Sequence, residues 1–176
     1  MRRIIIVLLG LVLILSATGC AASGPAANSV SASKDGFELN LYSDKQVYSS
    51  SDNINIYATL KYTGDGDTVT IWHANPYMSF SITEGKGFDT GGVDDRMLSS
   101  TVLVKDKLYN FNYQKTGGWD ENSPSASYWS SFYSDPNLVL PMGEYTVTVA
   151  GNFSLSEDNP SNLIGLSCEM KIKVVK

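Results

Sequence analysis

Alternation of apolar and polar side chains is the feature that most limits the fold of this chain. It begins at Phe37-Glu38-Leu39-Asn40-Leu41, where an apolar side chain occupies every second position. The same period of two recurs in residues 54–60, 69–71, 145–149 and 170–174. A β-strand points successive side chains to opposite faces, so this pattern predicts strands that are buried on one face and wet on the other.

Further apolar stretches and turn residues complete the pattern. We expect additional strands at residues 77–83, 97–104 and 108–114. Thr63-Gly64-Asp65-Gly66-Asp67 contains the glycines that a tight hairpin connection needs. About eight short strands separated by Gly, Asp and Asn predict an all-β fold, an antiparallel β-sandwich.

One segment departs from the period of two. Ser123-Pro124 offers an N-cap followed by a proline at the first helical position, and Asp135-Pro136 is a stop signal. Between them, four aromatic side chains follow at helical spacing: Tyr128, Trp129, Phe132 and Tyr133. We therefore expect one short helix inserted between two strands.

The first twenty residues indicate export. Arg2 and Arg3 precede an apolar run over residues 4–15, and small residues follow, which is the order of a secretory signal peptide. The apolar run is shorter than the roughly 20 residues that span a bilayer. Ser16-Ala17-Thr18-Gly19-Cys20 resembles the lipobox of bacterial lipoproteins, with Ala17 where leucine is commoner. The resemblance implies that Cys20 carries lipid, becomes the new N-terminus and holds the chain on the outer side of a membrane.

These features divide the chain into three parts. Residues 1–19 are the expected signal peptide. Residues 20–34 hold the lipidated cysteine and a stretch of mostly small and polar residues without aromatics, which predicts a flexible tether. Residues 35–176 are the expected sandwich, a length typical of one domain.

The charge balance limits the partners of the exported chain. Loss of Arg2 and Arg3 reduces the 13 Lys and Arg to 11, against 18 Asp and Glu, a formal charge of −7. Nucleic-acid binding relies on clustered basic residues, so we expect none. An acidic chain is also not attracted to anionic lipid, so we expect the acyl chains on Cys20 to provide the membrane contact.

A single cysteine remains after Cys20. Cys168 has no partner for a disulfide and lies in an alternating segment. We expect it to pack as a small buried hydrophobe, with a reactive or intermolecular thiol as the alternative.

Two segments resemble bacterial extracytoplasmic immunoglobulin-like (Ig-like) domains. Asp44-Lys45-Gln46-Val47-Tyr48 places a Lys-x-x-Tyr before an alternating strand, with Ser50-Ser51-Asp52 where these domains usually have a Pro-Gly-Glu turn. Leu140-Pro141-Met142-Gly143-Glu144-Tyr145 resembles their Pro-x-Gly-x-Tyr entry to a late strand. The similarity extends to the intracellular proteinase inhibitor (BsuPI-like) family and to Firmicutes-type lipoproteins. It implies an Ig-like sandwich; no reactive loop matches, so no inhibitory residue is implied.

Catalytic residues are scarce. Nucleophilic catalysis usually needs a histidine beside the nucleophile, and His73 is the only histidine. No serine lies in a Gly-x-Ser-x-Gly elbow. We therefore expect that the chain is not an enzyme. We expect His73 to have a structural role at a strand end. A pair of carboxylates as in a glycoside hydrolase stays open as a weaker alternative, because the distance between two carboxylates depends on the folded structure and cannot be read from the sequence.

Metal ligands are similarly limited. Zinc is not expected, since His73 and Cys168 would be its only nitrogen and sulfur ligands. Calcium stays open as an alternative at the acidic loops, which contain Asp65, Asp67, Asp94-Asp95 and Asp120-Glu121. These loops lack the spacing and closing glutamate of an EF-hand, so we expect solvated turns and assign no metal and no cofactor.

Aromatic residues are the main candidates for a binding surface. Trp72 and Tyr77 flank a probable strand end, Trp119 follows Gly117-Gly118 in a loop, and Trp129 lies in the expected helix. These rings either bind a glycan or peptide, or form a lid that closes the sandwich core. We expect a non-catalytic binding module at the cell envelope, with a glycan, an envelope protein or a protease as partner; a BsuPI-like protease inhibitor is the alternative, and an envelope hydrolase a weaker one.

Overall fold

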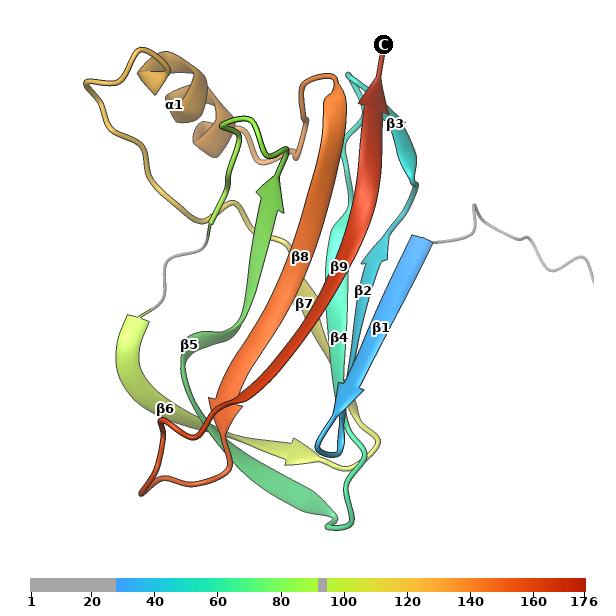
Figure 1. The fold of residues 1–176 in the computed structure, drawn as a ribbon, viewed down its shortest axis with the longest axis vertical. Coiled ribbons are helices and arrows are strands. Elements are labelled where there is room, and N and C mark those ends of the chain that lie inside the picture. The colour runs from blue at the N-terminus through green and yellow to red at the C-terminus, as the bar shows by residue number, and fades with distance from the viewer. Residues whose placement is uncertain (1–27, 92–94) are drawn as a thin grey trace, which may run out of the picture.

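The computed structural model describes residues 28–91 and 95–176. Its described elements are β1 (Asn28–Lys34), β2 (Phe37–Ser43), β3 (Val47–Ser49), β4 (Ile56–Tyr62), β5 (Thr68–Thr83), β6 (Asp95–Val104), β7 (Leu108–Asn112), α1 (Ala126–Ser134), β8 (Gly143–Ser154) and β9 (Ile164–Val175). The strands form two sheets packed face to face, with α1 at one end (Figure 1). The expected all-β sandwich with one short inserted helix is confirmed.

The order of the strands is that of an Ig-like sandwich. One sheet has the order β1-β2-β4-β7 and the other β3-β9-β8-β5-β6. With β2, β4 and β7 as strands A, B and E, and β9, β8 and β5 as G, F and C, both sheets follow the immunoglobulin arrangement. The Tyr145 hydroxyl, near the start of β8, donates to the carbonyl oxygen of Pro141 at 2.8 Å. This is the tyrosine corner that marks strand F in such domains.

One strand pair differs from the expected antiparallel arrangement. β3 pairs parallel with β9, with Val47 opposite Lys173 and Ser49 opposite Val175. The chain leaves the first sheet after β2, crosses to the second, and reaches β9 while running in the same direction. The three residues of β3 thus tie the two sheets together at this edge.

Alternation along the strands builds the core, as the sequence predicts. In β9, buried and exposed residues alternate over all 12 positions. Cys168 lies on its buried face, and its Sγ donates to the carbonyl oxygen of Leu39 in the opposite sheet at 3.3 Å. Burial raises the pKa of this thiol. The expectation of a small buried hydrophobe is confirmed.

The expected flexible tether is wrong for residues 28–34, which form β1. This strand pairs along its whole length with β2, from Asn28 opposite Ser43 to Lys34 opposite Phe37. Asp35 and Gly36 join the two strands, and both have positive φ. A two-residue turn of this kind matches the twist of a hairpin, and Asp-Gly is one of its preferred sequences. The signal peptide, Cys20 and residues 21–27 lie outside the described residues.

Two other boundaries differ from expectation. The segments 69–71 and 77–83 belong to one strand, β5, whose register shifts between His73 and Met78. A bulge lets a strand bend without ending, so the polar residues at its centre do not form a turn. α1 begins at Ala126 with Ser125 as N-cap, because a turn from Ser123 to Ala126 precedes it. Among the described residues, no helix is long and apolar enough to cross a membrane.

Candidate functional site: a cleft beside the helix

α1 lies beside one end of the sandwich, near the end of β5 (Figure 1). Phe132 is the buried residue of the helix. Its ring meets Phe88 edge to face at 5.7 Å, and Phe88 meets Tyr145 at 5.5 Å. Edge-to-face contacts of this kind favour burial beyond the area they remove from water. Phe132 therefore packs on the sandwich core, as expected for a lid.

The other rings of this end remain accessible. Trp119 is 38% exposed and Tyr128 is 40% exposed, while Trp129 and Tyr133 are half-buried. Trp119 stacks on Tyr133 with ring centroids 5.7 Å apart and planes 13° apart. Gly117 has positive φ and lies so close to the Tyr133 ring that a Cβ would collide with it. The loop before the helix is thus shaped to lay Trp119 on Tyr133.

Lys115 fastens this loop to the end of α1. Its Nζ donates to the carbonyl oxygens of Phe132 at 2.7 Å, Asp135 at 2.9 Å and Asn137 at 2.5 Å. The same atom lies 4.2 Å from the centroid of the Phe132 ring. Desolvation lowers the pKa of the Lys115 ammonium, and the charge of Asp135 opposes this shift. A cation at a helix C-terminus satisfies carbonyls that the helix itself leaves open.

A cleft of about 400 Å³ lies between this helix end and the four-stranded sheet. Its lining residues are Asn53, Ile54, Asn55, Ile56, Asn112, Tyr113, Gln114, Lys115, Tyr133, Asp135, Pro136 and Leu138, and we call it the Lys115 cleft. A second hollow of about 280 Å³ lies on the far side of Lys115, between Tyr128 and Pro141. The Lys115 cleft is the larger and combines side-chain amides with aromatic rings.

The amides of the cleft differ in their bonding. Asn53 Oδ1 accepts a hydrogen bond from the backbone N–H of Leu138 at 2.9 Å, so this residue holds the wall in place. The side-chain amides of Asn55, Asn112 and Gln114 make no hydrogen bond within the described part of the chain. Each amide has donors and acceptors available for a ligand.

An aromatic pair continues the cleft onto the sheet. Asn112 lies opposite Tyr57 in the β4–β7 ladder. Tyr57 is half-buried and stacks on Tyr42 of β2, with ring centroids 4.7 Å apart and planes 12° apart. Exposed Asn112 therefore lies between the cleft and a stacked tyrosine pair on the outer face of the four-stranded sheet.

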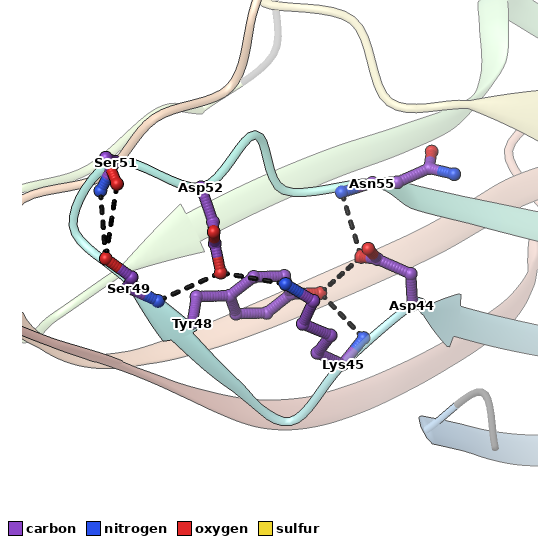
Figure 2. Close-up of polar contacts among 7 residues, drawn as sticks. All are labelled: Asp44, Lys45, Tyr48, Ser49, Ser51, Asp52 and Asn55. Atoms are coloured by element: carbon purple, nitrogen blue, oxygen red, sulfur yellow. Dashed lines mark hydrogen bonds and ion pairs between the residues drawn. The ribbon is translucent and has the colours of Figure 1, made fainter. Parts of the chain in front are cut away.

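The Lys-x-x-Tyr segment supports one wall of this cleft (Figure 2). The Tyr48 hydroxyl donates to Asp44 Oδ1 at 2.6 Å and accepts from the Lys45 N–H at 3.0 Å. Asp44 Oδ1 also accepts from the backbone N–H of Asn55 at 3.1 Å, and Figure 2 shows the Asn55 amide pointing away from this network. Burial, followed by the contact with Asp44, raises the pKa of Tyr48. The segment is structural, and it presents Asn55 to the cleft.

Asp52 fastens the turn that follows β3. Its Oδ2 accepts from the backbone N–H of Ser49 at 3.0 Å and lies 2.9 Å from Lys45 Nζ. The Lys45 hydrogen bond and then that of Ser49 lower the pKa of Asp52 (Figure 2). These two contacts hold the turn that follows β3.

The four predicted aromatic residues do not converge on one site. Trp119 and Trp129 both contact Tyr133 at the helix end. Trp72 lies on β5, on the face opposite buried Ile71, and is half-buried. Tyr77, also on β5, packs against His73 at 4.5 Å and Phe111 at 5.3 Å, so its half-buried ring packs against the core.

His73 has the structural role that we expected, but it lies within β5 and not at a strand end. It is buried, and its Nδ1 lies 2.7 Å from the carbonyl oxygen of Ala74 while Nε2 lies 2.9 Å from Thr101 Oγ1. A carbonyl can only accept, so Nδ1 carries the proton and Nε2 accepts from the hydroxyl. Both nitrogens are engaged.

The acidic loops do not form a cluster in the described residues. No group of three or more His, Cys, Asp and Glu side chains comes together there in a way that could hold a metal. Asp65, Asp67, Asp120 and Glu121 are exposed turn residues, and Asp94 lies outside the described residues.

The sequence patterns did not identify the residues of the Lys115 cleft as a candidate site. Asn112 and Gln114 belong to the expected strand at residues 108–114, of which β7 ends at Asn112, and Lys115 comes directly after it. No local pattern distinguishes these three from other polar residues of the chain. Their role depends on the helix end folding back over them.

Comparison with known proteins gives little. No family model matches this chain, and no curated protein matches it. A solved β-glucosidase from Erythrobacter marinus is similar over 85% of this chain and 16% of its own, at 12% identity and a TM-score of 0.36. A likeness this distant carries no information on function.

Proposed function

We propose that this chain is a lipid-anchored, extracytoplasmic and non-catalytic module that binds a carbohydrate in the Lys115 cleft. The observation that carries the proposal is one cleft that combines the half-buried rings of Tyr113 and Tyr133 with three side-chain amides that make no hydrogen bond in the described residues, and exposed Trp119 stacks on Tyr133 beside it. The cleft volume of about 400 Å³ lies in the range of small-molecule sites, about 300–1,000 Å³.

The chemistry of the lining suits a sugar. Asn55, Asn112 and Gln114 can each donate and accept, as sugar hydroxyls do. The Asp135 carboxylate adds an acceptor at the rim. Trp119 lies beside the cleft, because it stacks on the lining residue Tyr133, and its exposed side offers a flat apolar surface on which the C–H face of a sugar can stack.

The proposed location rests on the N-terminal sequence. A signal-like segment that ends at Cys20, together with an excess of acidic residues, supports lipid anchoring outside the membrane. Envelope glycans are polymers within reach of a protein held there.

Titration of residues 28–176, which contain every described strand and the helix, tests the carbohydrate site. Chitotetraose, cellotetraose and a peptidoglycan-derived muropeptide serve as separate probes, followed by tryptophan fluorescence and calorimetry. We expect saturable binding of at least one probe below about 10 mM, the weak end of useful affinity.

Matched variants locate the site. Trp119→Ala and Asn112→Ala should each weaken binding about tenfold, since one stacking or hydrogen-bond contact contributes about 1 kcal/mol. Trp72→Ala, on β5 and away from the cleft, should leave the affinity within about twofold. Binding of no probe, or an equal loss with Trp72→Ala, would overturn the proposal.

A further inference from the structure

The outer face of the four-stranded sheet is polar. Along β2 and β4, the buried residues that form the core alternate with residues that point outward. The strand registers place these outward residues and those of β7 in three rows: Tyr42, Tyr57 and Asn112; Asn40, Thr59 and Asn110; and Glu38, Lys61 and Leu108. We call this surface the polar sheet face.

The charges on the polar sheet face cancel. Lys61 Nζ lies 2.7 Å from Glu38 Oε2, and Asn40 Nδ2 donates to Glu38 Oε1 at 3.1 Å. The hydrogen bond from Lys61, and then the one from Asn40, lower the pKa of Glu38. Glu38 and Lys61 are the two charged residues of the three rows, so a phosphate or carboxylate finds no unpaired cation among them. The remaining polar groups are hydroxyls and amides, which suit a neutral ligand rich in hydroxyls.

Thr59, in the middle row, has an unsatisfied hydroxyl. The residue is 5% exposed, and its Oγ1 makes no hydrogen bond within the described structure. Most buried polar groups are bonded, because an unpaired one costs the free energy of its desolvation. Ala58 and Leu60 on either side face the core, so the Thr59 hydroxyl belongs to the polar sheet face. A ligand hydroxyl above this row would provide the missing partner.

Asn110 is opposite Thr59 in the β4–β7 ladder. It is exposed, and its side-chain amide makes no hydrogen bond to another described residue. The amide can therefore turn to admit a ligand hydroxyl to Thr59 and can bond to the ligand itself.

The polar sheet face is continuous with the Lys115 cleft. Asn112 belongs to both, since it lines the cleft and lies opposite Tyr57 in the first row. Tyr57 stacks on Tyr42 with one face of its ring, so its other face is turned toward β7 and Asn112. Successive rows are about 7 Å apart, so the three rows extend about 13 Å beyond the cleft. A ligand that follows them is a chain of units and not a single sugar.

We propose that the polar sheet face extends the Lys115 cleft into a binding surface for a neutral glycan chain of several sugar units. This inference rests on the proposed function, because the cleft holds one end of the chain. Tyr57 then packs against the next part of the chain, and Asn110 and Thr59 bond to hydroxyls of the units that lie outside the cleft.

Calorimetric titration with short and long oligosaccharides tests the length of the site. The protein is the full-length chain in a detergent without a sugar head group, and the probes are cello- and chito-oligosaccharides of two and six units. In at least one series, the hexamer should bind about tenfold or more tightly than the dimer, because it reaches Asn110 and Thr59.

The outcomes separate this inference from the proposed function. Equal affinities of dimer and hexamer would overturn the extended surface and leave the sugar site in the cleft intact. Binding of the charged muropeptide alone would overturn the neutral chain. Binding of no carbohydrate would overturn this inference together with the proposed function.

Asn110→Ala locates the additional contacts. It should weaken binding of the hexamer about fivefold or more and change the affinity for the dimer by less than about twofold. Asn152→Ala removes an exposed asparagine of β8, in the other sheet, and should leave both affinities unchanged. A hexamer that binds Asn110→Ala as tightly as the wild type, or an equal loss with Asn152→Ala, would refute the surface.

Thr59→Val gives a readout that a purely structural threonine would not give. Valine has nearly the same shape without the unpaired hydroxyl, so the melting temperature should stay the same or rise, while binding of the hexamer weakens about fivefold. Thr148→Val, at a half-buried position of β8, should leave the affinity for the hexamer unchanged. A lower melting temperature of Thr59→Val with unchanged binding would show that this hydroxyl serves the fold and would overturn its role in binding.

Discussion

At the scale of the residue, Tyr145 joins the core to the turn before β8. Its ring is buried against Phe88, and its hydroxyl bonds to the carbonyl oxygen of Pro141. Burial, followed by the charges of Glu84 and Tyr128, raises the pKa of Tyr145 to about 12. The Pro-x-Gly-x-Tyr segment placed this residue at a strand entry, and the structure adds the hydrogen bond and the packing.

Tyr145→Phe should lower the free energy of unfolding at pH 7 by about 0.5–1.5 kcal/mol, the usual contribution of one hydrogen bond. It should also reduce the loss of stability at high pH. The folded pKa lies above the unfolded value of about 10, so the stabilisation from Tyr145 is complete below pH 10 and is lost as the pH rises toward 12. Phenylalanine has no proton to lose. Urea unfolding at pH 7 and across pH 9–11 measures both effects.

Tyr42→Phe is the control for this change. Tyr42 is half-buried, stacks on Tyr57 and makes no hydrogen bond through its hydroxyl in the described structure. We expect it to change stability by less than about 0.5 kcal/mol. An alkaline slope that is identical in Tyr145→Phe and wild type would contradict the role given to Tyr145.

At the scale of the element, α1 depends on its surroundings. Its nine residues are fewer than the roughly 12–15 that an isolated helix needs. It has no acidic residue in its first turn and no basic residue in its last turn. Phe132 and the external cation of Lys115 therefore supply its stability.

Lys115→Met should lower the free energy of unfolding by about 1–3 kcal/mol, because it retains the apolar stem and leaves three carbonyls without their charged donor. Hydrogen exchange should increase in residues 126–134 before the rest of the domain. Urea unfolding and exchange mass spectrometry measure the two effects.

Lys86→Met removes the same charge from an exposed turn and should have little effect. If both variants unfold alike, or if exchange in α1 does not change, Lys115 does not hold the helix end.

The strands show which elements can be predicted from a local sequence pattern. Alternation predicted β2, β4, β8 and β9 because it reports directly which side chains face the core. It failed for β1, whose small residues lack a strong apolar face. Asp35-Gly36 was the available signal, since this pair is a preferred hairpin turn.

At the scale of the whole molecule, the proposed anchor and the sandwich lie close together in the chain. β1 begins at Asn28, so at most residues 20–27 separate the proposed lipid on Cys20 from the first strand. At about 3.5 Å per extended residue, this places the domain within about 30 Å of the membrane.

Cys20→Ser should abolish labelling of the chain by a radioactive or clickable fatty acid and release the protein from membranes. Two acyl chains are what make such an anchor stable, and serine has no thiol to carry the lipid. Fractionation and lipid labelling in a bacterial host measure the effect. Cys168→Ser is the matched control, because it removes the other cysteine, which is buried in β9, and should retain the label. Unchanged labelling of Cys20→Ser would refute the anchor.

What the sequence alone determined is local in origin. The period of two follows from the geometry of an extended backbone, so it identified most strands, their buried faces and the burial of Cys168. The spacing of the aromatic residues follows the 3.6-residue period of a helix, and it identified α1.

Tertiary structure decided which distant segments meet. The Lys115 cleft joins residues 53–56, 112–115 and 133–138, and Lys115 reaches carbonyls that lie 17 to 22 residues further along the chain. The polar sheet face likewise combines distant segments, because β4 pairs with β2 on one side and with β7 on the other. Strand order and helix docking depend on the packing of the whole core, which no single segment of the sequence encodes.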